Sequence, residues 1–367
     1  MQTFRFINAR FPDPAFSKDQ ITNRLRAHRR SLLAAKDGWE RPRKADGTVD
    51  EVRWQELRDS THLTLHDRSK IDRRAETISQ RHTAATGLSH LRKEDAKKLE
   101  VLRLGVRLAQ VTSEHHADEL AAALHAEFPW MAPATEAVWH AMRRSVRAGD
   151  PGLRMSPMLL DGPPGIGKSA WARALGNLIN TPSMVYEASN ENASFGLVGS
   201  QRSWGNSNPG RLITAILAHR VGNPVVVVDE VEKSGRAESA KGQAYSLTDA
   251  LLPLLEPLSA RNWSCPYFEV TFDMSYVIWV MTSNNHRRLP EPFLSRCPPI
   301  RLQALSTADL TAFATREGSR KLLDEASIEA VCEAIERCGE PARMSLRAVV
   351  RMIEKAAILE ANGMRRH

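Results

Sequence analysis

The chain contains a glycine-rich run, GPPGIGKS, at residues 162–169. It matches the pattern G-x-x-x-x-G-K-[ST] in full and lies between an apolar run at 158–160 and a helical pattern at 170–179, which is the setting this pattern requires. Glycines let backbone N–H groups turn inward around a phosphate, and the following helix directs its positive end at the same anion. The run therefore predicts a nucleotide-binding loop formed by Gly162, Pro163, Pro164, Gly165, Ile166, Gly167, Lys168, Ser169 and Ala170.

The end of this loop and a second motif carry the reactive side chains. Lys168 directs a positive charge at the β- and γ-phosphates of ATP, and Ser169 offers its hydroxyl to Mg²⁺. The run VVVVDE at residues 225–230 predicts a buried strand that ends in two carboxylates. Asp229 would reach the Mg²⁺, and Glu230 would activate the water that attacks the γ-phosphate. We therefore expect ATP and Mg²⁺ as cofactors, with Ser169 and Asp229 at the metal and Lys168 and Glu230 in catalysis.

A third buried strand is predicted by YVIWVMTSNN at residues 276–285. If this strand lies between the strand before the glycine-rich loop and the VVVVDE strand, Asn284 is positioned to hold a water against the γ-phosphate. Thr282 and Asn285 are the alternatives, and an asparagine pair also suits a left-handed turn. We expect Asn284 to take this catalytic role.

Short apolar runs alternate with helical patterns across residues 158–302. The runs are continuous rather than alternating, which indicates strands buried on both faces and hence a parallel α/β sheet. No strand signal follows residue 306, and three or more helices fit residues 307–362. Before the sheet, apolar residues spaced by three and four predict helix from about Lys93 to Ala126 and again from about 134 to 147.

The overall composition is that of a globular protein. Hydrophobic residues make up 42% and charged residues 26%, and no apolar run approaches the ~20 residues that a membrane-spanning helix needs. The first residues lack the pattern of a signal peptide. Four cysteines without a CxxC pair indicate neither a disulfide framework nor a zinc site. We expect a cytoplasmic protein that does not contact membranes.

Positive charge is concentrated in the first third of the chain. Residues 1–110 hold 24 Lys and Arg against 15 Asp and Glu, a net +9, whereas residues 111–367 hold 27 against 28, a net −1. This asymmetry indicates two parts with different partners. The most compact basic cluster comprises Arg24, Arg26, Arg29 and Arg30. The cluster either binds nucleic-acid phosphates or forms a solvated helix face, and no base-reading motif accompanies it.

Further segments resemble the ATPase module of Lon proteases, a branch of the AAA+ ATPases, in their order and near their spacing. They are PGRLITAIL, VVVVDEVEK, SLTDALLPLLEP, YFEVTFDMSYVIWVMTSN, PEPFLSRCPPIRL and PARMSLRAVVRMIEKA, within about residues 130–363. The resemblance implies a P-loop αβα core with a parallel sheet at 128–304, a small helical lid at 305–367, and a homo-oligomeric ring that is usually hexameric. Residues 1–127 would then form a basic, mainly helical N-terminal region and linker of unknown fold.

The resemblance also implies roles for residues outside the loop. Arg296, in PFLSRCPP, matches the arginine that reaches the nucleotide of a neighbouring subunit, and Arg343, in PARMSLR, matches the lid arginine that senses the γ-phosphate. Arg347 is the alternative to Arg343. Both lie at the predicted start of the last helix, where the helix dipole disfavours cations, so arginines at this place are easier to explain if they face a phosphate. By the same resemblance, Trp130 or Met131 is expected near the adenine.

Two departures from Lon are visible in the sequence. In Lon the lid is followed by a Ser-Lys peptidase domain, for which the residues after this lid leave no room, so we expect no intrinsic peptidase activity. The family's pore loop carries an aromatic residue, whereas the matching place reads Leu197-Val198-Gly199. Trp204 follows, either as a replacement for that aromatic residue or as a buried anchor.

These observations lead to three hypotheses. The first is a Lon-like ATPase that couples ATP hydrolysis to the remodelling or unfolding of a protein recruited through the N-terminal region. The second is a nucleic-acid-associated AAA+ ATPase that uses the basic residues, and the third is a nucleotide-gated scaffold or switch. The resemblance favours the first hypothesis. ATPase rates measured with unfolded protein and with nucleic acid would discriminate between the first two.

Overall fold

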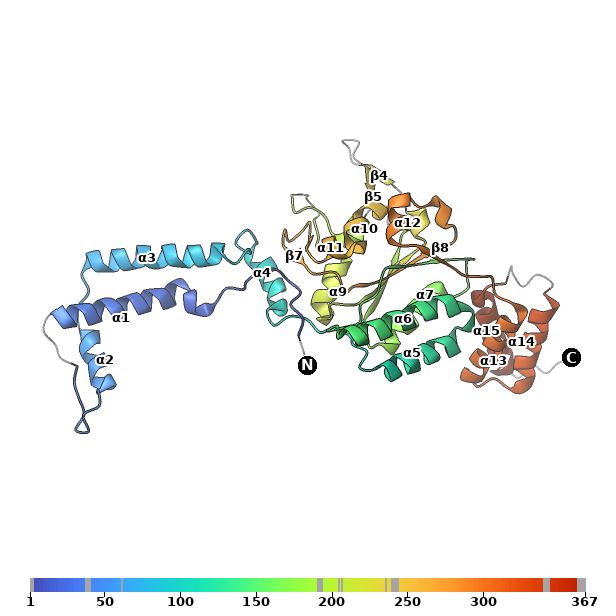
Figure 1. Cartoon of the computed structure of the whole chain (residues 1–367), viewed down its shortest axis with the longest axis horizontal. Coiled ribbons are helices and arrows are strands. Elements are labelled where there is room, and N and C mark those ends of the chain that lie inside the picture. The colour runs from blue at the N-terminus through green and yellow to red at the C-terminus, as the bar shows by residue number, and fades with distance from the viewer. Residues whose placement is uncertain are drawn as a thin grey trace. The chain divides into compact units, whose positions relative to one another are not determined.

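A computed structural model of the chain describes residues 3–36, 41–60, 62–189, 194–203, 205, 207–234, 236–238, 244–338 and 344–361 (Figure 1). The chain divides into two compact units. Residues 9–103 form one, which we call the inserted unit, and residues 1–8 together with 104–367 form the other, which we call the core unit. The domain boundaries expected after residues 127 and 304 both fall inside the core unit and stay predictions.

The inserted unit is built on two long helices that pack along each other, α1 (Lys18–Lys36) and α3 (Leu65–Ala84). Ile21 of α1 and Ile71 and Ala75 of α3 are buried, so the contact is made by small and branched apolar side chains. The other elements of this unit are short and comprise α2 (Glu51–Ser60), α4 (Lys93–Leu99), η1 (Pro14–Phe16) and η2 (Glu100–Leu102).

The helix predicted from Lys93 to Ala126 is wrong as a single element. Helical structure ends at Leu102 and resumes only at Glu114. Between them, Gly105 has φ +84°, and a Cβ atom there would lie 2.4 Å from the carbonyl oxygen of Phe4. A residue with positive φ beside another backbone segment ends the helix, and apolar spacing alone does not reveal it.

The core unit contains a five-stranded sheet in the order β2-β3-β8-β1-β9, with all neighbouring strands parallel. Its strands are β1 (Met158–Asp161), β2 (Ser183–Glu187), β3 (Val225–Asp229), β8 (Ile278–Ser283) and β9 (Pro299–Arg301). The predicted parallel α/β class is confirmed, and β8 lies between β1 and β3, as the hypothesis for Asn284 requires. Because the carboxyl ends of parallel strands meet at one edge, the residues that follow β1, β3 and β8 converge there.

Helices cover both faces of this sheet (Figure 1). The four valines at 225–228 have no exposed surface, which explains why β3 is continuously apolar. Val225, Val227 and Ile278 share one buried cluster with residues of the helices on one face. Those helices are α5 (Glu114–Glu127), α6 (Ala132–Ala148) and α7 (Lys168–Leu178), and the other face carries α9 (Arg211–His219) and α10 (Leu247–Leu255).

Three helices follow the sheet and pack together: α13 (Thr307–Arg320), α14 (Glu325–Arg337) and α15 (Leu346–Ala361). Ser306 and Asp309 form a capping box that starts α13. These helices match the predicted helical C-terminal region.

The remaining elements are short. They are α8 (Phe195–Val198), α11 (Pro257–Ala260), α12 (Glu291–Arg296), the hairpin β4 (Arg236–Glu238) with β5 (Ala244–Ser246), the hairpin β6 (Trp263–Ser264) with β7 (Thr271–Phe272), η3 (Pro129–Met131), η4 (Val231–Lys233) and η5 (His286–Arg288). Within the described ranges, no helix is both long enough and apolar enough to span a membrane.

Candidate functional site

The glycine-rich loop connects β1 to α7 and has two residues in the left-handed region, Gly165 at φ +79° and Gly167 at φ +94°. A Cβ atom at Gly165 would lie 2.4 Å from the Cβ atom of Ser345. The next residue, Leu346, donates its N–H to the carbonyl oxygen of Gly165 at 3.0 Å. The loop therefore needs glycine both for its backbone conformation and for the close approach of α15.

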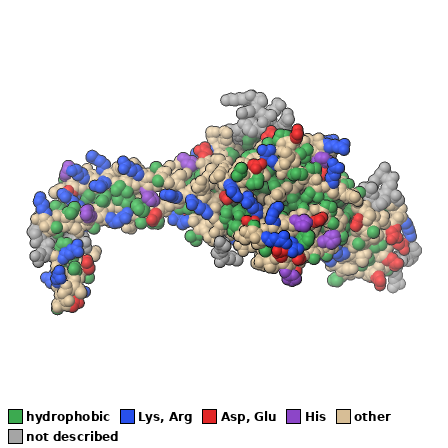
Figure 2. All heavy atoms as spheres, in the orientation of Figure 1, with side chains coloured by type: hydrophobic (Ala, Val, Ile, Leu, Met, Phe, Trp, Pro, Cys, Tyr) green, Lys and Arg blue, Asp and Glu red, His purple; other side chains and the backbone are tan. Residues whose placement is uncertain are grey.

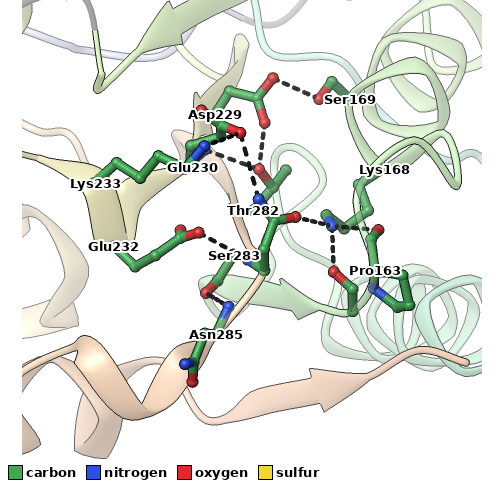
Figure 3. A network of polar contacts seen from close by, with 12 residues as sticks. Pro163, Lys168, Ser169, Asp229, Glu230, Glu232, Lys233, Thr282, Ser283 and Asn285 are labelled. Carbon is green, nitrogen blue, oxygen red and sulfur yellow. Dashed lines mark hydrogen bonds and ion pairs between the residues drawn. The ribbon is translucent and has the colours of Figure 1, made fainter.

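Lys168 is the first residue of α7 and is only 7% exposed. Its Nζ donates to the carbonyl oxygens of Gly162 at 2.6 Å and Pro163 at 3.0 Å, and to Oδ1 of Asn284 at 3.0 Å (Figure 3). Burial lowers the pKa of Lys168, and the nearby Asp229 carboxylate partly offsets this effect. In the described part of the chain, only neutral oxygens bond this buried ammonium, an arrangement that fits an incoming anion.

Asp229, the last residue of β3, binds two hydroxyl groups at the carboxyl edge of the sheet. Its Oδ2 accepts a hydrogen bond from Ser169 Oγ at 2.9 Å, and its Oδ1 accepts one from the hydroxyl of Thr282 (Figure 3). A carboxylate beside a hydroxyl provides the hard oxygen ligands that Mg²⁺ prefers. No group of three His, Cys, Asp or Glu among the described residues could hold a metal alone. Ser169 and Asp229 therefore fit a Mg²⁺ ion that also binds substrate phosphates and water.

Glu230 follows β3 with φ +53°, a conformation uncommon for residues other than glycine. Its N–H donates to Oγ1 of Thr282 at 3.1 Å. Its Oε1 accepts hydrogen bonds from Lys233 Nζ at 2.7 Å and from Asn284 Nδ2 at 3.3 Å. Asn284 therefore contacts both Glu230 and Lys168, so the three side chains form one connected group.

The three polar residues considered after β8 have different partners. Thr282 bonds to Asp229, and Asn285 uses its side-chain oxygen to cap η5 through the N–H of Arg287. Asn284 alone of the three bonds both to the loop lysine and to Glu230. This placement favours Asn284 as the water-holding residue, although the role itself stays a prediction.

A cleft of about 780 Å³ opens beside these groups, between the loop and helices α13 and α15. Its lining includes several arginines and aromatic residues that the sequence analysis did not assign to the site: Phe128, Arg173, Phe313, Arg316, Arg320 and Arg351. For Arg351 the sequence does contain a signal: it stands one helical turn after Arg347 on α15, so the two arginines share a helix face, and both line the cleft. The arginines of α13 gave no comparable signal, since their position depends on how the three C-terminal helices pack.

The segment expected near the adenine reaches the cleft through a different residue. Met131 is fully buried in the core, and Trp130 donates its Nε1 hydrogen to the carbonyl oxygen of Ile166 at 2.8 Å. Phe128 lines the cleft and packs edge-on against Trp130, with ring centroids 6.0 Å apart. Trp130 thus holds the glycine-rich loop through this hydrogen bond. The contact of Trp130 or Met131 with adenine stays a prediction.

Of Arg296, Arg343 and Trp204, the structure describes only Arg296. Arg296 does not line this cleft; its Nη1 donates to the carbonyl oxygen of Pro292 at 2.9 Å, and its Nε lies 3.7 Å from Glu256. Arg343 and Trp204 lie outside the described residues. In the expected pore-loop segment, Leu197 is fully buried.

The segment that contains the sheet and the glycine-rich loop is similar to known proteins. Residues 158–304 match the family described as ATPase family associated with various cellular activities (AAA). The chain is similar to the peroxisomal Lon protease homolog 2 of Oryza sativa subsp. indica, with 29% identity over 49% of this chain and 20% of the relative. Lon protease of Treponema pallidum (strain Nichols) is 28% identical over 52% of this chain and 20% of the relative. Lon protease of Magnetococcus marinus is 29% identical over 47% of this chain and 21% of the relative. The match thus covers about a fifth of the length of these relatives.

Proposed function

We propose that the chain is a Mg²⁺-dependent ATPase that drives the remodelling or unfolding of a protein partner, because residues 158–304 match the AAA family and the chain is similar to Lon proteases. The supporting observation is the connected group of Lys168, Asn284 and Glu230 beside the Ser169–Asp229 pair. Together these residues provide a phosphate-binding cation, metal ligands and a base at one end of a cleft large enough for a nucleotide.

Each residue of the group has a distinct role in the proposed reaction. Lys168 exchanges its bonds to the carbonyl oxygens of the loop for bonds to phosphate oxygens. Ser169 and Asp229 hold Mg²⁺, which when bound neutralises charge on the phosphates. Asn284 orients the attacking water, and Glu230 accepts its proton.

Arginines complete the proposed site. We assign the lid role to Arg343 or Arg347; Arg347 lines the cleft. Arg296 acts in trans on the nucleotide of a neighbouring subunit, in a homo-oligomeric ring that the resemblance predicts to be hexameric. Such an arginine offsets charge that develops in the transition state and can change the rate by ~10³–10⁵. We assign no peptidase chemistry to these residues.

The test is ATP turnover by the full chain with Mg²⁺ or with EDTA, in the presence and absence of an unfolded protein. We expect turnover that needs Mg²⁺ and rises when the unfolded protein is added. Turnover that ignores every unfolded protein tried would contradict the remodelling role but not the ATPase. Absence of Mg²⁺-dependent hydrolysis in a preparation that binds ATP would contradict the ATPase itself and favour a nucleotide-gated scaffold.

A further inference from the structure

Helix α3 of the inserted unit directs its carboxylates at helix α1. Each of its three carboxylates forms an ion pair with α1, with N···O distances of 2.6 Å for Lys18–Glu76, 3.4 Å for Arg26–Asp72 and 2.9 Å for Arg29–Asp67. The residue numbers rise on one helix as they fall on the other, so the two helices run antiparallel. Two arginines of the cluster identified in the sequence are therefore already paired within the unit.

A third arginine of that cluster is also held within the unit. Arg24 donates to the carbonyl oxygen of Ala15 at 2.6 Å and lies over the ring of Phe16. The charge that remains available for a partner must therefore be sought on other residues.

Four cations of α3 lie on the face turned away from α1, and we call them the α3 stripe: Lys70, Arg73, Arg74 and Arg81. All four are exposed, and none forms an ion pair with another described residue. At about 100° per residue they fall within an arc of roughly 100°, and the buried Ile71 and Ala75 lie outside it. The stripe extends for roughly 16 Å along the helix. Figure 2 shows Lys and Arg side chains along the α1 and α3 segment.

We propose that the α3 stripe binds the phosphate backbone of a double-stranded nucleic acid. A duplex carries one negative charge per ~1.7 Å of its axis, so a length of roughly 16 Å offers more phosphates than the four cations require. Three of the four are arginines, whose planar guanidinium groups bind phosphate through two parallel hydrogen bonds. The inference does not depend on the proposed ATPase.

The residues within the stripe favour this partner over other anionic surfaces. Ser69, Thr77 and Gln80 are the exposed polar residues beside the cations, so the stripe has no apolar side chain that would enter a bilayer. It also has no aromatic anchor of the kind that dominates protein interfaces. The same lack of aromatic residues argues against single strands, which bind by stacking their bases on aromatic rings. A backbone contact with a duplex, independent of sequence, remains.

The test measures binding of the full chain to fluorescent 20-base-pair duplexes by anisotropy, over a range of salt. With four phosphate contacts, we expect the binding constant to fall by about 10²-fold between 50 and 200 mM salt, and equally for unrelated sequences. Changing Lys70, Arg73, Arg74 and Arg81 together to Gln keeps helix propensity and should make the log–log salt slope shallower by about 3 to 4. Binding at ~0.1 M salt should weaken at least tenfold.

A matched control removes the same charge from another part of the inserted unit, by changing Arg41, Arg43, Lys44 and Arg53 to Gln. These residues are also exposed. The control should keep most of the duplex affinity, and circular dichroism should show that both variants retain their helices. Equal weakening by the control would mean that net charge alone binds the duplex and would overturn the proposal. An unchanged salt slope in the α3 variant, or tighter binding to phosphatidylserine vesicles, poly-glutamate or single strands than to the duplex, would overturn it as well.

Discussion

Glu230 and Glu232 stand two residues apart after β3 but have different surroundings. Glu230 shares its Oε1 with Lys233 and Asn284, whereas Glu232 accepts the backbone N–H of Asn284 at 3.0 Å. Only Glu230 lines the cleft. A general base must sit within reach of the water that it deprotonates, so the two carboxylates should differ sharply in their contribution to turnover.

The prediction is that Glu230→Gln retains ATP binding and loses ATP turnover by ~10²–10⁴-fold, because a neutral amide cannot accept the proton. Steady-state ATPase rates and the binding of a fluorescent nucleotide provide the measurement. Glu232→Gln is the control, because its amide oxygen can still accept the bond from Asn284, and we expect its rate to stay within a few-fold of wild type. Equal losses in the two variants would refute the assignment of the base.

Gly165 provides a second test at the scale of single residues. Gly165→Ala should destabilise the core unit and weaken nucleotide binding, because the alanine would have to adopt φ +79° and its methyl group would meet Ser345. Gly149→Ala separates these causes, since Gly149 has φ +65° but no atom within 4 Å of the added Cβ position. We expect a cost of ~1 kcal/mol for Gly149→Ala from backbone strain alone, a larger cost for Gly165→Ala, and a loss of nucleotide affinity only in the latter. Chemical denaturation and nucleotide titration would measure the two effects.

At the scale of elements, helices α5 and α6 are joined by one carboxylate. Glu114, in the first turn of α5, accepts hydrogen bonds from Arg147 at 2.8 Å and from Arg143 at 2.7 Å. These bonds, with Arg147 contributing most, lower the pKa of Glu114 from 4.5 to about 2. Because the folded-state pKa of Glu114 is depressed, its bonds to Arg143 and Arg147 stabilise the fold above about pH 4.5. This contribution is lost as the pH falls toward 2.

Glu114→Gln should therefore lower the melting temperature most at neutral pH, and the difference from wild type should shrink steadily below pH 4.5. Thermal denaturation followed by circular dichroism at several pH values would test this dependence. Glu119→Gln is the control on the same helix, since Glu119 is exposed and its only ion pair in the described structure is with His115. A difference between Glu114→Gln and wild type that stays constant from pH 7 to 3 would contradict the linkage.

The elements that local chemistry determines were predictable from sequence. GPPGIGKS could be placed between a strand and a helix, and VVVVDE could be assigned to a buried strand, because glycine content and a continuous apolar run are properties of each segment alone. The break at Gly105 was not predictable, because it depends on Phe4, a residue about a hundred positions away. The pairing of Arg26 and Arg29 with α3 has the same origin, since their partners lie 46 and 38 residues further along the chain.

The cleft shows a similar division. Lys168, Glu230 and Asn284 line the cleft, and their proximity can be predicted because they belong to motifs that end strands or begin a helix. Phe128, Arg316 and Arg320 line the same cleft without any motif, because their positions follow from the packing of α13 and from the turn at η3. Tertiary contacts determine these residues, and no single segment of sequence records them.

At the scale of the whole molecule, the proposed trans role of Arg296 can be tested by mixing subunits. Lys168→Ala and Arg296→Ala chains should each be inactive alone, but their mixture should recover part of the ATPase activity. A mixed interface can pair an intact Lys168 site with an intact Arg296 from the neighbour. The control mixes Lys168→Ala chains with chains that carry both Lys168→Ala and Arg296→Ala. This mixture should recover no ATPase activity, because it contains no intact Lys168. Failure of the first mixture to exceed its components, with assembly shown by light scattering, would contradict action in trans.

The core unit begins before the inserted unit and resumes after it. Phe4 and Val106 exchange backbone hydrogen bonds at 2.8 and 2.9 Å, so the two points where the chain leaves and re-enters the core unit lie on paired segments. A short linker from Asn8 to Leu104 would span the gap, and closing so short a loop costs little entropy. The region that carries the α3 stripe is thus a cassette in the topological sense: we expect that it could be excised, or exchanged for another module, without cutting through the sheet that holds the nucleotide loop.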